Sequence, residues 1–157
     1  MIVTTVIVDM FSHTEYVERS NRMKKIFVFV LILMCSLSLV ACGGNVENCK
    51  ITECSSEIYS DAEMESAIRV VKNYFRMNFE GCTLTEIGYL GDDQLDEYLE
   101  FAERNNADDV IVLVSTFQVD ASGGDGSLNP NSTYTNWEWI LVRSNGGMWR
   151  HVDHGYG

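Results

Sequence analysis

The side chains best suited to catalysis lie near the end of the chain, in the run His151-Val152-Asp153-His154. If this run forms a strand, His151 and Asp153 share one face and His154 points to the other. A His–Asp pair of this kind could act as a general base or supply two zinc ligands. A third metal ligand is not evident, and no Ser or Cys stands in a recognisable nucleophile motif. A hydrogen-bonded pair at the end of a sheet is therefore the simpler interpretation, with catalysis by His151 and Asp153 as the alternative.

A long polar stretch, residues 120–137 (DASGGDGSLNPNSTYTNW), carries a second set of candidates. Asp120, Asp125, Asn129 and Asn131 offer oxygen ligands, and the glycines permit the sharp turns of a calcium loop. The spacing differs from an EF-hand and no closing Glu follows, so a strand-joining loop with Asx turns is the alternative. Loops longer than about 12–15 residues are often functional. We expect this one to bind a partner, without a metal or cofactor.

Aromatic side chains follow directly after that loop. Trp137 and Trp139 share one face of an expected strand, because their spacing is two, and Glu138 faces the other way. They could line a cleft for a sugar or peptide, although such sets more often form core and cross-strand pairs. The aromatic set comprises Tyr134, Trp137, Trp139, Trp149 and Tyr156. The predicted binding surface combines loop and aromatic residues: Asp125, Asn129, Asn131, Tyr134, Trp137 and Trp139.

The first element expected to support these residues is an amphipathic helix. Ser60 and Glu63 have the spacing of a capping box, which marks a helix start. Gly81 marks its end. Between them, apolar residues recur at helical spacing: Met64, Ile68, Val71, Phe75 and Phe79. A helix with one apolar stripe must bury that stripe against another element.

The remaining elements are strands and one further helix. Strands are expected over 82–90, 109–119, 137–143 and 148–156, the last two joined by a Ser-Asn-Gly-Gly turn at 144–147. The apolar first half of 109–119 should be buried on both faces. A helix capped by Asp92 or Asp93 should bury Leu95, Tyr98, Leu99 and Ala102. This order predicts an α+β domain, with two helices on one face of a curved antiparallel sheet of about four strands.

Residues 23–42 have the features of a signal that directs a protein out of the cytoplasm. Met23-Lys24-Lys25 is cationic, and the apolar run 26–41 is shorter than the roughly 20 residues of a membrane-spanning helix. This layout is typical of a secretory signal. Leu39-Val40-Ala41-Cys42 resembles the lipobox of bacterial lipoproteins. The resemblance implies cleavage before Cys42, a diacylglycerol on its sulfur, and anchoring on the outer face of the cytoplasmic membrane. An uncleaved membrane anchor is the alternative.

The sequence also predicts a division of the chain. Residues 1–22 precede a complete signal sequence, so they are interpreted as a mis-assigned start or a disordered extension. The codons of Glu18-Arg19-Ser20 can contain AGGAG, a ribosome-binding sequence just before Met23. A genuine N-terminal extension is the other possibility. Residues 23–41 are the signal, 42–56 are polar and aperiodic and are expected to form a flexible tether, and 57–157 form the α+β domain.

The net charge and the cysteine count limit the kinds of partner that the chain can bind. The chain has 23 acidic and 11 basic residues, a net charge of −12. Such a surface repels phosphate backbones, so no nucleic acid is expected, and membrane contact is assigned to the acyl group. After Cys42, the three cysteines Cys49, Cys54 and Cys82 are an odd number, and their pairing is left open. Cys82 is expected to pack as a small apolar residue at a strand start.

Three segments carry a family resemblance: GCTLTEIGYLGDD, DGSLNPNSTYTNWEWILVR and GGMWRHVDHGYG. They resemble small uncharacterised clostridial-type lipoproteins of Gram-positive anaerobes. The domain, residues 57–157, also resembles the extracellular tail of penicillin-sensing regulatory metallopeptidases. The order of elements is similar to the cystatin-like or nuclear-transport-factor-like cone. The metallopeptidase motif His-Glu-x-x-His is absent from the sequence, so protease chemistry does not carry over.

The function expected from these features is that of an extracytoplasmic lipoprotein with a small, non-catalytic binding or sensing domain. Its partner would be an envelope protein or a small ligand. The alternative is a hydrolase or isomerase that uses His151 and Asp153 in a cone-shaped pocket. An enzyme requires those side chains inside a concave pocket with shifted pKa values. A binding module should instead present an exposed patch of loop and aromatic residues.

Overall fold

The computed structural model describes residues 43–156. The predicted signal sequence and the predicted lipidation site Cys42 lie outside the described residues, so both stay predictions. Among the helices that are described, none is sufficiently long and apolar to span a bilayer.

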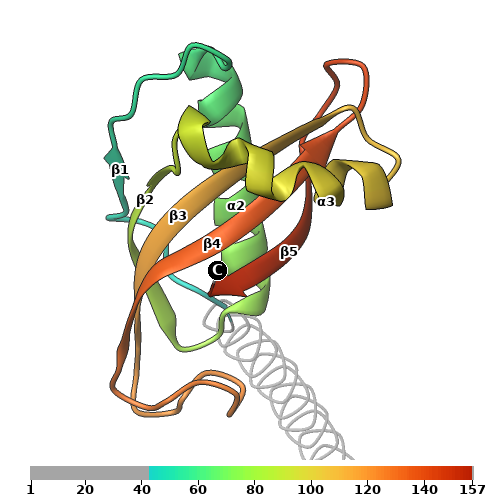
Figure 1. Cartoon of the computed structure of the whole chain (residues 1–157). Coiled ribbons are helices and arrows are strands. Elements are labelled where there is room, and N and C mark those ends of the chain that lie inside the picture. The colour runs from blue at the N-terminus through green and yellow to red at the C-terminus, as the bar shows by residue number, and fades with distance from the viewer. Residues whose placement is uncertain (1–42, 157) are drawn as a thin grey trace, which may run out of the picture. The chain divides into compact units, whose positions relative to one another are not determined.

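A five-stranded sheet forms the centre of the domain (Figure 1). The strands lie in chain order: β1 (Lys50–Thr52), β2 (Cys82–Tyr89), β3 (Asp109–Val119), β4 (Thr133–Arg143) and β5 (Arg150–Tyr156). All neighbouring pairs are antiparallel except β1 and β2, which are parallel. The α+β class is therefore confirmed, while the expected sheet of about four antiparallel strands lacks β1. This strand has only three residues, all exposed, so it leaves no periodic signal in the sequence.

The start of the described chain packs against the domain. Asn45 is bonded to β2 from both sides: its N–H donates to the Cys82 carbonyl at 2.8 Å, and its carbonyl accepts from the Leu84 N–H at 2.8 Å. Val46 is buried in the core, and Gly44 lies against the ring of Phe75. The expectation of a flexible tether over 42–56 is therefore wrong for the part of it that carries these contacts and β1.

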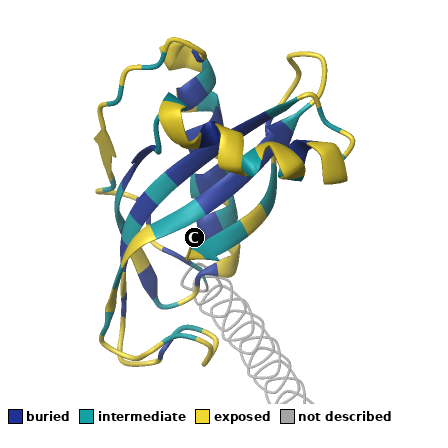
Figure 2. Ribbon diagram, in the orientation of Figure 1, coloured by how far each residue is buried: buried dark blue, intermediate teal, exposed yellow. Residues whose placement is uncertain are grey.

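Helix α2 (Asp61–Asn78) begins as the sequence predicts. The Ser60 hydroxyl accepts from the Glu63 N–H, and the Glu63 carboxylate accepts from the Ser60 N–H at 2.9 Å, which completes the capping box. One stripe of the helix is buried: Met64, Ala67, Ile68, Val71 and Phe75. Figure 2 shows buried residues on both α2 and the strands, and together they belong to one core cluster.

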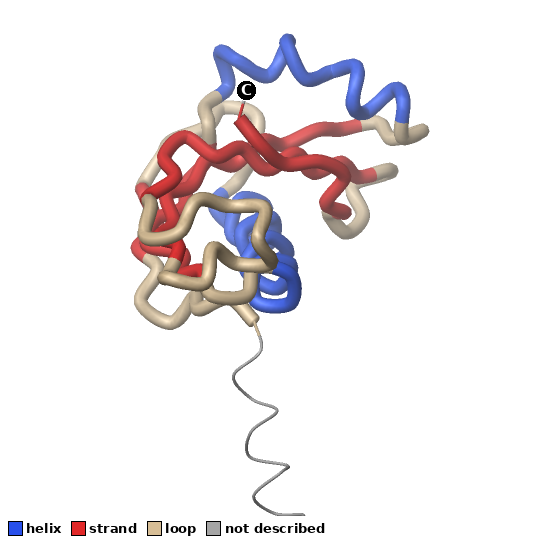
Figure 3. Tube along the Cα trace, turned by 90° about the horizontal axis from the view of Figure 1, so that it is seen from below, coloured by secondary structure: helices blue, strands red, loops and turns tan. Residues whose placement is uncertain are grey.

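The second helical segment lies on the other face of the sheet from α2. It consists of a 3₁₀ helix, η2 (Asp92–Tyr98), followed by the short helix α3 (Leu99–Arg104). Figure 3 shows the two helical layers on opposite sides of the sheet, so the prediction that both helices cover one face is wrong. The sheet needs a helix on each face because β3 is apolar on both of its faces. Its residues Val110 to Leu113 are all buried, as expected for a strand covered on both sides.

The start of this second segment differs from the prediction. Its N-cap is Gly91, without a side-chain hydrogen bond. Asp92 instead accepts hydrogen bonds from the Ser56 hydroxyl at 2.5 Å and the Glu57 N–H at 2.7 Å, so it fixes the preceding loop. Leu95 and Ala102 are buried as predicted, whereas Leu99 is 51% exposed. The 3₁₀ turns shift the register, and Leu99 thereby leaves the inner stripe.

Candidate functional site

A β-bulge decides which side chains of β5 face the inside of the sheet. Ile140 pairs with Asp153 but Leu141 pairs with His151, so Val152 is an extra residue in β5. Because of this insertion, His151 and His154 both lie on the face of Trp139 and Leu141, and Asp153 lies on the other. The expectation that His151 and Asp153 share a face is therefore wrong. The structure brings together the two histidines instead.

The two imidazoles are in hydrogen-bonding contact. Nε2 of His151 lies 3.2 Å from Nδ1 of His154, so one ring donates and the other accepts. The ring of Tyr74 on α2 lies 4.1 Å from His151, and the ring of Trp139 stacks on His154 at 5.1 Å. Burial, together with the neighbouring His154, lowers the pKa of His151 to about 4, and burial also lowers the pKa of His154. Both rings are therefore neutral at neutral pH.

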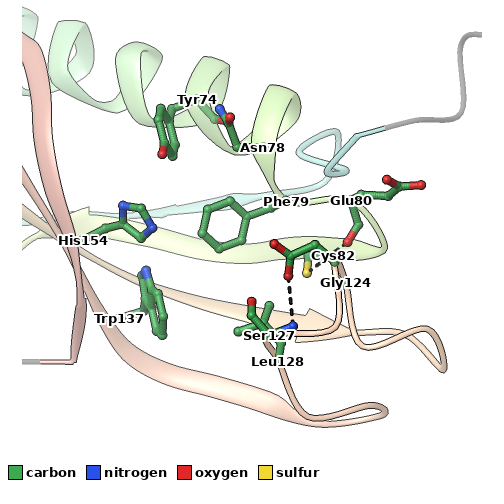
Figure 4. Close-up of a pocket in the computed structure, with 11 residues that line it drawn as sticks. Tyr74, Asn78, Phe79, Glu80, Cys82, Gly124, Ser127, Leu128, Trp137 and His154 are labelled. Atoms are coloured by element: carbon green, nitrogen blue, oxygen red, sulfur yellow. Dashed lines mark hydrogen bonds between the residues drawn. The ribbon is translucent and has the colours of Figure 1, made fainter.

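A pocket of about 320 Å³ opens beside this pair (Figure 4). It lies where the end of α2 meets β4, β5 and the loop between β3 and β4. The residues that line it are Tyr74, Asn78, Phe79, Glu80, Cys82, Gly124, Asp125, Ser127, Leu128, Trp137 and His154. Its volume falls at the lower end of the range of ligand pockets, roughly 300–1,000 Å³.

One end of the pocket is aromatic. The ring of Trp137 lies 6.4 Å from that of Phe79 and 5.9 Å from that of His154. The buried indole nitrogen of Trp137 has no hydrogen-bond partner among the described residues. In Figure 4 this nitrogen is on the side of the indole that faces His154. A buried donor without an acceptor is uncommon and costs stability, so this N–H is available to an acceptor that a ligand could supply.

The opposite end is polar. The carboxylate of Asp125 accepts from the Ser127 N–H at 3.0 Å (dashed in Figure 4), and hydrogen bonds from Ser127 lower its pKa, so it is ionised. Burial, with the charges of Asp120 and Asp125, raises the pKa of the Cys82 thiol to about 11. Cys82 is therefore a protonated, buried residue at the start of β2, as its sequence context predicts, and not an activated nucleophile.

The structure places the predicted binding residues in different surroundings. Asp125 and Trp137 line the pocket, although twelve positions apart in sequence. Trp139 is fully buried in the core, with its indole N–H donating to the Ser115 hydroxyl at 2.8 Å. Tyr134 and Asn129 bond to each other, because the Tyr134 hydroxyl accepts from the Asn129 N–H at 3.1 Å.

The loop itself has the turns expected of a strand connection. Ser122 N–H donates to the Asp120 carboxylate at 2.8 Å, and Asn131 N–H donates to the Asp120 carbonyl at 2.9 Å. Asn131 has φ of 55° and is exposed. Across residues 43–156, no group of three or more His, Cys, Asp or Glu side chains could hold a metal ion. The loop therefore follows the Asx-turn interpretation in its geometry.

Several lining residues were not among the candidates from sequence. Phe79 belongs to the apolar stripe predicted for the first helix, Tyr74 is beside that stripe, and Ser127 and Leu128 have no distinctive motif. Figure 4 shows Tyr74 and Phe79 directed from the end of α2 toward His154 and Trp137. The signal that the sequence offers is the group of aromatic residues near the end of α2: Tyr74, Phe75 and Phe79. That signal does not distinguish a pocket wall from a packed core.

A second, more open pocket of about 530 Å³ lies between α2 and the segment that carries β1. Its floor is apolar, with Met64, Ile68 and Tyr89, and its rim carries carboxylates. The full lining is Ile51, Thr52, Glu53, Cys54, Ser55, Asp61, Met64, Glu65, Ile68 and Tyr89. Within residues 43–156, Cys49, Cys54 and Cys82 are free cysteines that form no disulfide with one another.

Comparisons with protein families, with curated proteins and with solved structures found no match for the chain. The resemblance to clostridial-type lipoproteins and regulatory metallopeptidase tails therefore stays a prediction.

Proposed function

We propose that this chain is an extracytoplasmic lipoprotein, anchored to the outer face of the cytoplasmic membrane through a diacylglycerol on Cys42. Its domain binds a small ligand in the pocket between α2, β4 and β5 and does no chemistry on it. The proposal rests on one observation. The pocket joins an aromatic end, with the unpartnered Trp137 indole nitrogen, to a polar end with the ionised Asp125.

The shape of the sheet fits this role. In the cystatin-like cone expected from the sequence, a concave sheet surrounds one helix. We propose that the sheet curves around α2 in the same way. A pocket at the open end of such a cone accepts a ligand without a change in the core. An envelope protein as partner is the alternative occupant, and it would use the same exposed loop, residues 120–132.

The hydrolase or isomerase alternative has less support. It requires His151 and Asp153 to act together, but these residues lie on opposite faces of β5. Of the β5 side chains, His154 lines the pocket, and its nitrogen is engaged with His151. No carboxylate accepts a hydrogen bond from either imidazole in the described residues, so neither ring has the carboxylate partner that a His–Asp general base requires.

The anchor is tested by metabolic labelling with an alkyne fatty acid in a Gram-positive host. Wild-type chain should incorporate the label and sediment with membranes, and Cys42→Ser should do neither. Cys35→Ser is the matched control and should behave as wild type. Label that persists in Cys42→Ser would contradict lipidation at this residue.

The pocket is tested on the chain from Gly43, which contains the core cluster of the described residues. Three probes with one skeleton and different charge are used: 2-phenylethanol, 2-phenylethylammonium and phenylacetate. Binding of at least one, mapped by amide chemical shifts to the pocket and lost in Leu128→Trp, supports the proposal. Leu99→Trp, on the exposed side of α3, controls for the added indole. Pocket amides unmoved by all three probes at millimolar concentration would contradict it.

A further inference from the structure

The lining of the aromatic pocket is unbalanced in charge. Among the described residues that line it, two are acidic, Glu80 and Asp125, and none is Lys or Arg. Burial lowers the pKa of His154, so this residue adds no positive charge at neutral pH. In Figure 4 the Glu80 carboxylate points away from the other lining side chains, which leaves Asp125 as the carboxylate of the polar end.

From this arrangement we infer that the ligand is a small organic cation: a protonated amine joined to a flat apolar body that carries a hydrogen-bond acceptor. The inference rests on the proposed function, because it assigns a chemical class to the ligand of that same pocket. Each part of the ligand corresponds to one part of the lining.

The amine corresponds to the polar end. A protonated amine beside Asp125 would form a charge-assisted hydrogen bond, about twice as strong as a neutral one. Asp120 adds negative potential there, since both carboxylates act on the Cys82 thiol, a lining residue. An anionic ligand would meet the same carboxylates without a compensating cation in the lining, so the pocket selects against it.

The flat body corresponds to the aromatic end. The rings of Tyr74 in α2 and of Phe79 at its C-cap lie 6.5 Å apart, and the ring of Trp137 on β4 lies 6.4 Å from that of Phe79. Aromatic faces attract both apolar groups and cations, and the attraction increases where water is displaced. A ligand of this class therefore makes favourable contacts along the whole pocket, whereas a purely polar cation makes them at one end only.

The acceptor corresponds to the indole nitrogen of Trp137. This donor is buried and has no partner in the described residues. An ether, hydroxyl or carbonyl oxygen on the ligand would provide the missing bond. The field of the whole chain, with its net charge of −12, adds a long-range attraction for cations and increases the association rate at low salt.

The test compares the same three phenylethyl probes quantitatively by isothermal titration with the chain from Gly43. We expect 2-phenylethylammonium to bind about threefold more tightly than 2-phenylethanol, as is typical of an ion pair with an exposed carboxylate such as Asp125, and phenylacetate not to bind. In Asp125→Asn the amine should lose this preference while 2-phenylethanol binds as before, which also shows that the variant is folded. Asp93→Asn, an exposed carboxylate on η2, changes the net charge equally and should leave the preference intact.

The outcomes separate the inference from the function on which it rests. If none of the probes binds, the pocket is not a ligand site and both fail. If the probes bind equally, or the alcohol or acid binds best, the pocket binds ligands but the cationic class is wrong. A preference for the amine that survives Asp125→Asn but is lost in Glu65→Gln would place the cation in the second pocket and overturn the assignment to this one.

Discussion

His151 and His154 lie side by side on β5, with Nε2 of the first 3.2 Å from Nδ1 of the second, although three positions separate them in the chain. In a regular strand such residues face opposite sides. The bulge at Val152 brings them together beneath Tyr74 of α2. Two buried imidazoles in contact resist protonation, because a charge on either one is desolvated and lies next to the other ring.

This pair predicts a loss of stability in mild acid. The pKa of His151 is lowered to about 4 in the folded protein, against about 6.5 when unfolded. Between these values the unfolded chain binds the extra proton, so the free energy of unfolding falls as pH decreases from about 7 toward 4. We expect His151 to account for about 1–2 kcal/mol between pH 7 and pH 5, measured by urea denaturation at both values.

The matched control for that prediction is His151→Gln, which is polar and cannot titrate. Its stability should depend less on pH over the same interval. The carboxylates with lowered pKa values, among them Glu63 at about 2, lose their contribution only below their ordinary range near 4. An equal slope in wild type and His151→Gln between pH 7 and pH 5 would show that His151 is not buried neutral.

The parts of the fold that could be predicted are those with a local signal. The α2 capping box needs only the spacing of Ser60 and Glu63, and the α2 stripe needs only its period. The burial of β3 on both faces follows from its continuous apolar run. Strand β1 has no such signal, because three polar or exposed residues become a strand only by pairing with β2, far along the chain.

The candidate site could be predicted only in part, for a similar reason. Asp125 and Trp137 are conspicuous by type, and the structure places both in one pocket. The prediction that His154 and its neighbour His151 lie on opposite faces of the strand is wrong, because a bulge changes the alternation of side chains. No residue in 150–156 signals this bulge in the sequence. Trp139 shares a face with Trp137, as expected, but packs fully under Tyr74 and Phe75, which a period of two cannot reveal.

A second prediction concerns Arg143, which joins α2 to the sheet. Its guanidinium lies 2.7 Å from a Glu63 carboxylate oxygen, 2.8 Å from Asp109, and over the ring of Trp149 at 4.2 Å. Arg143→Met should lower the free energy of unfolding by about 2 kcal/mol, since Asp109 then loses its charged partner in a half-buried setting. Both carboxylates are partly exposed, which keeps the loss below that of a fully buried pair.

The control for this prediction is Arg143→Lys, measured in the same chemical denaturation. It keeps the charge but not the planar fork or the stacking on Trp149, so its loss should be intermediate. Equal stability of Arg143→Met and wild type would mean that the ion pairs contribute nothing beyond packing.

A third prediction tests whether the segment before β1 is packed in solution. A Cβ at Gly44 would lie 2.5 Å from the Phe75 ring and 2.6 Å from its carbonyl oxygen. Gly44→Ala should therefore destabilise the domain by about 1–3 kcal/mol, as overpacking does elsewhere. It should also increase cleavage by trypsin after Lys50. Glu47→Ala, exposed in the same segment, should change neither quantity. Unchanged stability of Gly44→Ala would indicate that this segment is detached.

The last prediction concerns the buried hydrogen bond between Trp139 and Ser115. The Trp139 indole N–H donates to the Ser115 hydroxyl at 2.8 Å, and Ser115 is only 2% exposed. Ser115→Ala removes the acceptor and leaves the indole donor buried, which should cost about 1–3 kcal/mol in chemical denaturation.

A double-mutant cycle separates this hydrogen bond from the packing of the indole ring. Trp139→Phe removes the donor but also leaves a cavity, so it is destabilising for a different reason. In the Trp139→Phe background, Ser115→Ala should cost less, because no donor remains to be left unpaired. If Ser115→Ala costs the same free energy of unfolding in both backgrounds, the hydrogen bond to Trp139 does not stabilise the sheet. The contribution of the Ser115 hydroxyl would then come from the bond that it donates to the Trp137 carbonyl at 3.3 Å.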